Sequence, residues 1–101
     1  MKVFISQPMK GLTDEEILKV REEAIATVTR AFGTYEDIEI IDSFFQSAPV
    51  DAKPLWYLGK SLELLSTADI CIFVGSWKEA RGCKIEHECC VQYGIPTIYF
   101  N

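Results

Sequence analysis

The chain has 101 residues, of which 49% are hydrophobic and 25% are charged, a balance typical of globular proteins. Its 15 acidic and 10 basic residues give a formal net charge of −5 at pH 7. This charge, together with the lack of a Lys/Arg cluster, argues against nucleic acid or an anionic membrane as the partner, because both attract a basic face. A small anionic ligand held by local donors remains compatible with it.

The start of the chain and its cysteines bear on the compartment. The segment "MKVFISQP" is too short and too soon broken for a signal peptide, and no run of about 18 apolar residues could span a bilayer. We therefore expect a cytoplasmic protein whose 4 cysteines stay reduced. Residues 1–101 are long enough to fold as one domain.

The first predicted elements are a strand at residues 2–6 and a long helix. Thr13 and Glu16 have the spacing of a capping box, so the helix should begin there, run to about Phe32 and end at Gly33. Apolar residues then recur at steps of three and four and define the buried face: Ile17, Val20, Ala24, Val28 and Ala31.

The middle of the chain predicts a second strand over residues 38–42 and a connecting loop over residues 43–53. Pro54 suits the first turn of a helix that runs to about Ser66. Four leucines should form the buried face of this helix: Leu55, Leu58, Leu62 and Leu65.

The last part of the chain predicts a strand, a helix and a final strand. Residues 68–75, "ADICIFVG", form a nearly continuous apolar run, which is typical of a strand covered on both faces. A helix over residues 82–93 should end at Gly94, and residues 96–100 form the last strand.

Four strands alternating with three helices predict an α/β fold. Right-handed crossovers make it a small flavodoxin-like or Rossmann-like three-layer sandwich with a four-stranded parallel sheet in the order 2-1-3-4. Ligands of such sheets bind at the carboxyl ends of the strands, beside the point where the strand order reverses. The residues predicted to lie there are Ser6, Gln7, Pro8, Met9, Gly75, Ser76, Trp77, Arg81 and Gly82.

Several common chemistries lack their motifs in this sequence. Neither G-x-G-x-x-G nor G-x-x-x-x-G-K-[ST] occurs, so dinucleotide and P-loop functions are unsupported. A phosphatase-type Cys with an Arg six residues later is absent, and so are the acidic residues of a receiver domain after the first strand. The topology alone does not indicate a function.

Glu86 is the leading catalytic candidate. We expect it in the first turn or so of the last helix, where unpaired N–H groups and the helix dipole favour an ionised carboxylate. Such a carboxylate can attack an electrophilic sugar carbon. The alternative is a glutamate that only complements the dipole. Glu88 points away around the helix and cannot pair with Glu86.

A stripe of metal-ligating residue types runs along the same helix. Cys83, His87 and Cys90 recur at i, i+4 and i+7, so that a metal ion could be held there with Glu86. However, zinc sites usually draw ligands from two segments, and the chain has no C-x-x-C and no second His. We favour the alternative that Cys89 and Cys90 are core residues and His87 is solvated. No metal or other cofactor is therefore expected.

Two residues before this helix have open alternatives. Trp77 could stack on a ligand ring, although such a residue more often packs at a loop. Arg81 could bind a phosphate or carboxylate beside the helix N-terminus, and a solvated arginine is equally consistent with the sequence.

With these residues located, the sequence resembles the nucleoside 2-deoxyribosyltransferase-like superfamily, and it is most similar to the small members. The resemblance covers most of the chain and rests on "KVFISQPMKG", "STADICIFVGSW" and the segment from Arg81 to Pro96. That segment approximates the pattern S-R-G-x-x-x-E-x-x-x-A-x-x-x-G-x-P, with Cys90 at the alanine position. The spacing from Glu86 to Gly94 is its most specific part.

The resemblance implies that Glu86 attacks C1′ of a (deoxy)ribosyl group, expels the base and forms a glycosyl-enzyme, from which a second base or water takes the sugar. It implies a homodimer or larger homo-oligomer and an Arg81 that meets a 5′ substituent. The residues that it places around the sugar or base are Gln7, Pro8, Gly75 and Trp77.

The chain departs from the family at two positions. Transferases carry aspartates that orient the base or assist its departure, whereas Ser61 and Ala80 or its neighbours stand here. Asp69 begins the third strand at the edge away from the site and is expected to be structural. We therefore expect N-glycosidic bond cleavage or (deoxy)ribosyl transfer, with a non-catalytic nucleotide-binding module as the alternative.

Overall fold

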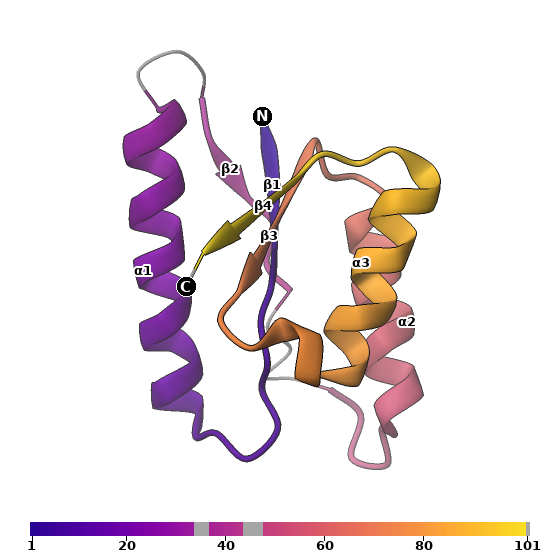
Figure 1. The fold of residues 1–101 in the computed structure, drawn as a ribbon. Helices are drawn as coiled ribbons and strands as arrows, with labels where there is room; N and C mark the ends of the chain where they lie inside the picture. The colour runs from indigo at the N-terminus through magenta and orange to yellow at the C-terminus, as the bar shows by residue number, and fades with distance from the viewer. Residues whose placement is uncertain (34–36, 44–47, 101) are drawn as a thin grey trace.

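The computed structural model describes residues 1–33, 37–43 and 48–100, so that part of the predicted 43–53 loop lies outside the described residues. The elements are β1 (Lys2–Ser6), α1 (Asp14–Phe32), β2 (Glu39–Ile40), α2 (Pro54–Leu65), β3 (Ile70–Val74), the 3₁₀ turn η1 (Trp77–Glu79), α3 (Arg81–Tyr93) and β4 (Thr97–Phe100). The strands form one parallel sheet in the order β2-β1-β3-β4, which confirms the predicted Rossmann-like α/β fold (Figure 1). Over the described ranges, no helix has the length and apolar character that crossing a membrane requires.

Helices cover both faces of the sheet: α1 lies on one side, and α2 and α3 lie on the other (Figure 1). The alternation of side chains along β1 explains the two cores. Val3 and Ile5 pack in the α1 core, whereas Phe4 packs in the α2/α3 core. All residues of β3 are buried, as expected for a strand covered on both faces.

α1 begins with the predicted capping box. The Thr13 hydroxyl accepts a hydrogen bond from the Glu16 N–H, and the Glu16 carboxylate accepts one from the Thr13 N–H, both at 3.1 Å. Ala31, predicted to be buried, is exposed. The 19-residue helix is about 28 Å long and the five-residue strand β1 only about 17 Å, so the end of α1 extends past the sheet.

Arg21 occupies the buried face of α1, which the apolar pattern did not predict. Its guanidinium donates to the Ile41 carbonyl at 2.7 Å and to the Ser43 hydroxyl at 3.3 Å. Burial lowers the pKa of Arg21, and the charge of Asp42 opposes this shift. Arg21 therefore ties α1 to the carboxyl end of β2.

Two predictions for the middle of the chain were partly wrong. Leu55 is 75% exposed because it lies in the first turn of α2, beyond the strands that cover the end of this helix at Leu65. β2 is shorter than predicted because only Glu39 and Ile40 pair with β1. The prediction that α2 begins at Pro54 is confirmed.

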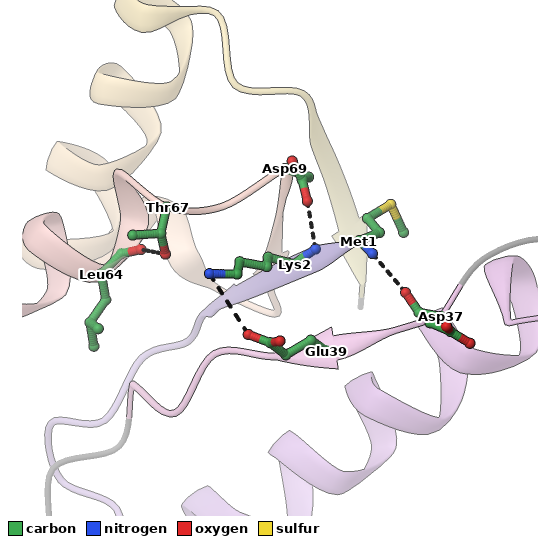
Figure 2. A network of polar contacts seen from close by, with 7 residues as sticks. All are labelled: Met1, Lys2, Asp37, Glu39, Leu64, Thr67 and Asp69. Carbon is green, nitrogen blue, oxygen red and sulfur yellow. Dashed lines mark hydrogen bonds and ion pairs between the residues drawn. The ribbon is translucent and has the colours of Figure 1, made fainter.

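The amino end of the sheet is held by a network of polar contacts (Figure 2). The Lys2 N–H donates to the Asp69 carboxylate at 2.7 Å, and the Asp69 N–H donates to the Lys2 carbonyl at 2.8 Å. The ammonium group of Met1 donates to the Asp37 carbonyl at 2.7 Å, and the Lys2 ammonium lies 3.9 Å from the Glu39 carboxylate. Asp69 thus joins β3 to β1 at the edge away from the predicted site.

Candidate functional site

The helix that carries the candidate carboxylate starts slightly earlier than predicted. α3 begins at Arg81, one residue before the predicted start at Gly82, so Glu86 is its sixth residue and lies early in the second turn. Gly94 ends α3 as predicted, with a φ of 73°, a left-handed conformation that favours glycine. The buried stripe of α3 consists of Cys83, Glu86 and Cys90.

The Glu86 carboxyl group is enclosed by three elements. Only 6% of the residue is exposed, and its Oε1 accepts a hydrogen bond from the Ser6 hydroxyl at 2.7 Å. Ser6 shares the face of β1 that Phe4 uses, which directs its side chain toward α3. Ser61 of α2 is a second hydroxyl neighbour, and it acts to lower the pKa of the carboxyl group. The carboxyl ends of the sheet therefore hold a buried carboxyl group against the Ser6 hydroxyl.

Burial controls the charge of this group. It raises the pKa of the Glu86 carboxyl to about 7, while the hydrogen bonds from Ser6 and Ser61 act in the opposite direction. The carboxyl group is therefore present in both proton states near neutral pH, whereas the helix dipole alone favours the ionised state. The loss of solvation disfavours the ionised carboxylate by more than the helix dipole, one turn away, favours it.

The cysteines near Glu86 are packed thiols. Cys83 is buried beside Glu86 and Ser6, and burial raises its pKa to about 11. Cys71 of β3 and Cys90 are hydrogen-bonded in the α2/α3 core, and this bond and burial raise the pKa of Cys71. Cys90 is thus a core residue as predicted, whereas Cys89 is only partly buried. Within the described residues, no group of three His, Cys, Asp or Glu side chains could hold a metal ion.

The side chain of Gln7 contacts α1, on the opposite face of the sheet from the contact between Ser6 and α3. Its amide nitrogen donates to the Ile17 carbonyl of α1 at 3.0 Å, and the residue is 6% exposed. Its amide oxygen is buried and meets no hydrogen-bond partner in the part of the chain that the structure describes. Pro8 is half-buried and Met9 is exposed. Gln7 therefore has an acceptor left for a donor from outside these residues.

The residues predicted after β3 gather on the other side of α3. A hollow of about 530 Å³ is lined by Gly75, Ser76, Trp77, Lys78, Glu79, His87 and Tyr99. Neither Ser6 nor Glu86 lines it. The structure thus divides the predicted site into a carboxyl group on the β1 side of α3 and an aromatic hollow on the β4 side.

The aromatic rings of this hollow pack on one another. Trp77 lies 5.1 Å from Phe73 and 4.3 Å from His87 between ring centroids. His87 was predicted to be solvated, but it is half-buried, and its Nε2 is 2.8 Å from the Tyr99 hydroxyl. The prediction was wrong because β4 places Tyr99 beside α3, which no local pattern around His87 indicates.

The first turn of α3 is open to solvent. Arg81 is exposed, and its side chain makes no hydrogen bond or ion pair to another described residue. A Cβ added at Gly82 would meet nothing within 4 Å, so there is space beside this turn. The arginine can therefore reach an anion placed at the start of the helix.

Ser61 is the site residue whose role the sequence did not reveal. It was considered only as a departure from the resemblance, and its hydroxyl acts to lower the pKa of Glu86. The signal that could have found it is its position in the second turn of α2, one turn before Leu65, on the side that faces α3.

No protein-family model, curated protein or solved structure matches this chain. The chemistry open to the site follows from its geometry. A carboxyl group with a pKa of about 7 is present in both proton states near neutral pH. The ionised form can serve as a nucleophile and the protonated form as a general acid.

Proposed function

We propose that the protein cleaves the N-glycosidic bond of a nucleoside or nucleotide, or transfers its (deoxy)ribosyl group, with Glu86 as the nucleophile. The observation that supports this most is the buried Glu86 carboxyl group, held by Ser6 at 2.7 Å at the carboxyl edge of the sheet. Ligands of parallel α/β sheets bind at this edge. The spacing from Glu86 to Gly94, which resembles the nucleoside 2-deoxyribosyltransferase-like pattern, adds a second argument.

The proposed reaction has two displacements at one carbon. The Glu86 carboxylate attacks C1′, the C1′–N bond breaks, and its electron pair leaves with the base, which takes a proton from water. The ester formed at Glu86 is then attacked at C1′ by water or by a second base, which frees the carboxylate. Ser6 orients the carboxylate, because the hydrogen bond from its hydroxyl restricts the rotation of that group.

The alternative function is a non-catalytic nucleotide-binding module. The observation that favours it is Ser61 itself, since a hydroxyl supplies a hydrogen bond but not the charge of the aspartate that transferases have there. Base exchange depends on assisting the departing base, so it suffers more from this change than binding does.

The decisive test is release of free base. The wild-type protein is mixed with deoxynucleosides, ribonucleosides and their 5′-monophosphates, with and without a second base, and the products are separated by chromatography. Release without a second base identifies a hydrolase, and a new nucleoside identifies a transferase. Binding of these compounds with no product from any of them would contradict the enzyme and leave the binding module.

Glu88 provides the matched control for the nucleophile. It lies on the exposed side of the same helix and accepts a hydrogen bond from Gln92 at 2.9 Å. Glu86→Ala should abolish base release, and Glu88→Ala should retain it. Undiminished cleavage by the Glu86→Ala protein would remove Glu86 from the mechanism.

A 5′-phosphate on the substrate is part of the proposal. Exposed Arg81 and the N–H groups of the first α3 turn offer donors to an anion. Nucleoside monophosphates should then raise the melting temperature more than nucleosides do. Equal shifts with both ligand types, or an unchanged difference in Arg81→Ala, would remove Arg81 from the site.

We also propose that the protein acts in the cytoplasm as a homodimer or larger homo-oligomer. β2 and β4 lie at the two edges of the sheet. A second copy can cover such an edge and complete a pocket that has few walls in one chain. Sedimentation at roughly tens of micromolar should show the oligomer, and a monomer would contradict it.

A further inference from the structure

The aromatic hollow on the β4 side of α3 has no role in the proposed reaction. Its rings come from three elements: Trp77 from η1, His87 from α3 and Tyr99 from β4. The plane of Trp77 makes angles of only 23° with Tyr99 and 31° with His87, at centroid distances of 5.7 Å and 4.3 Å. Trp77 and Tyr99 are thus stacked, whereas His87 is tilted, since its plane makes an angle of 44° with that of Tyr99.

We infer that this hollow binds a planar heteroaromatic ring by stacking, at a site separate from Glu86. The stacked pair of Trp77 and Tyr99 can be extended by another flat ring, because offset stacking is a favoured arrangement of aromatic rings. A cage for an organic cation would instead need aromatic walls that stand around the cation. The volume of about 530 Å³ lies in the range of small-molecule sites.

The rim of the hollow suits the edge of a heterocycle. Ser76 offers a hydroxyl, Lys78 an ammonium and Glu79 a carboxylate, so donors and acceptors surround the aromatic floor. The Lys78 ammonium lies 5.7 Å from the centroid of the Trp77 ring, which shows that a group can approach this ring. Lys78 is exposed, so it can move aside when a ligand enters.

The aromatic rings of the hollow remain partly open to solvent. Phe73, which lies beneath them, is fully buried, whereas Tyr99 keeps 55% of its surface exposed. The contact of 2.8 Å between His87 and Tyr99 holds two of the rings in place. A stacking surface that is already ordered costs little entropy on binding.

The hollow and the Glu86 side chain lie on different sides of α3. Glu86 contacts Ser6 and Ser61 on the β1 and α2 side of α3. His87 is the next residue, turned by about 100° around the helix, and it packs on Phe73 at 4.9 Å. The inference therefore holds whether or not Glu86 cleaves a glycosidic bond.

The chain's 2 tryptophans provide the readout. Trp77 lines the hollow, and Trp56 lies on α2, where it packs edge-on against Tyr57. Adenine is the probe, because it has no glycosidic bond to cleave, and ribose is the non-aromatic control. In amide and indole NMR spectra, adenine should shift the Trp77 indole N–H and leave that of Trp56 unchanged, with Trp56→Phe providing the assignment.

Variants then locate the site. Tyr99→Ala should weaken adenine binding roughly 5-fold or more, since stacking on an aromatic side chain typically contributes at least that factor. Glu86→Gln should leave the Trp77 shift unchanged. Ribose should move neither indole signal.

Three results would overturn the inference. One is a Trp77 signal that adenine does not move. Another is an adenine response confined to the amides of Ser6, Ser61 and Glu86, which would place the ring at the carboxylate. The third is a Trp77 shift that follows protein concentration without adenine, which would make the hollow a contact between copies.

Discussion

Each end of the sheet has a carboxylate that accepts a hydrogen bond from β1. At the amino end, Asp69 accepts from the Lys2 N–H at 2.7 Å, and at the carboxyl end, Glu86 accepts from the Ser6 hydroxyl at the same distance. Asp69 is exposed, whereas Glu86 is 6% exposed. The two bonds are geometrically alike, so solvent decides what each carboxylate can do. Asp69 holds two strands together, and Glu86 has a proton affinity suited to chemistry near neutral pH.

The largest expected difference between Glu86 and Asp69 is in the rate of base release. Glu86→Gln keeps the size of the side chain but removes the nucleophile, so base release should fall by roughly three orders of magnitude or more. Asp69→Ala should keep base release near the wild-type rate. Equal losses in the two variants, measured by chromatography of released base, would contradict the proposed difference in function.

The second expected effect is on stability as a function of pH. The pKa of Glu86 is raised from 4.5 to about 7 in the folded protein. Below pH 4.5 both states are protonated. Between pH 4.5 and about 7 only the unfolded chain releases the proton, so the free energy of unfolding should fall as pH rises, by up to about 3 kcal/mol. Above about pH 7 the carboxyl group is ionised in both the folded and the unfolded state, so the free energy of unfolding falls no further on its account.

Urea unfolding at pH values across this window measures the effect. The Glu86→Gln protein cannot titrate at this position, so the stability of the wild type relative to this variant should decline with rising pH. A constant difference between the two proteins would show that the carboxyl group is not protonated in the folded state.

The third expected effect is a shift of the pH profile of base release. The hydrogen bond from Ser6 lowers the pKa of Glu86, and that from Ser61 does so to a smaller extent. Ser6→Ala should therefore move the midpoint of the rising limb upward by about one pH unit, and Ser61→Ala by less. Ser66→Ala, which removes a bond to the Glu63 carbonyl at the end of α2, is the control and should leave the midpoint unchanged.

The fourth expected effect is on stability at the amino end. Asp69→Ala removes the acceptor for the Lys2 N–H, and water can replace it because the site is exposed. The free energy of unfolding should fall by about 1 kcal/mol. A loss several times larger would show that Asp69 contributes more to the free energy of unfolding than its hydrogen bond to Lys2 accounts for.

The smallest expected effect is at the Lys2–Glu39 pair. The two charges lie 3.9 Å apart and both side chains are about half exposed or more, at 48% and 68%. Glu39→Gln should change the free energy of unfolding by less than about 0.5 kcal/mol, as is usual for exposed ion pairs. A larger, salt-sensitive loss would place this pair in a stronger network.

The order of the strands and the caps of the helices could be predicted because their signals are local. Thr13 and Glu16 lie within one turn, and the αL position of Gly94 follows directly on the helix that it ends. Topology then placed Glu86 at the correct edge of the sheet. The start of α3 was predicted to within one residue.

Properties that depend on distant segments could not be predicted. The proton affinity of Glu86 depends on burial against β1 and α2, and its bond to Ser6 spans 80 residues. The environment of His87 depends on Tyr99, which arrives with the last strand. The exposure of Leu55 depends on where the sheet ends beneath α2.

The bond between Ser6 and Glu86 also has a consequence for folding. It joins two segments 80 residues apart, and β1 must pair with β3, at Val3 and Ile70, across an intervening helix, strand and helix. Contacts of such sequence separation close late, because the entropy of the loop is lost before they form. An intermediate that retains only local helices would therefore contain no assembled site. Recovery of activity during refolding should report the completion of the central strand pair rather than the formation of helices.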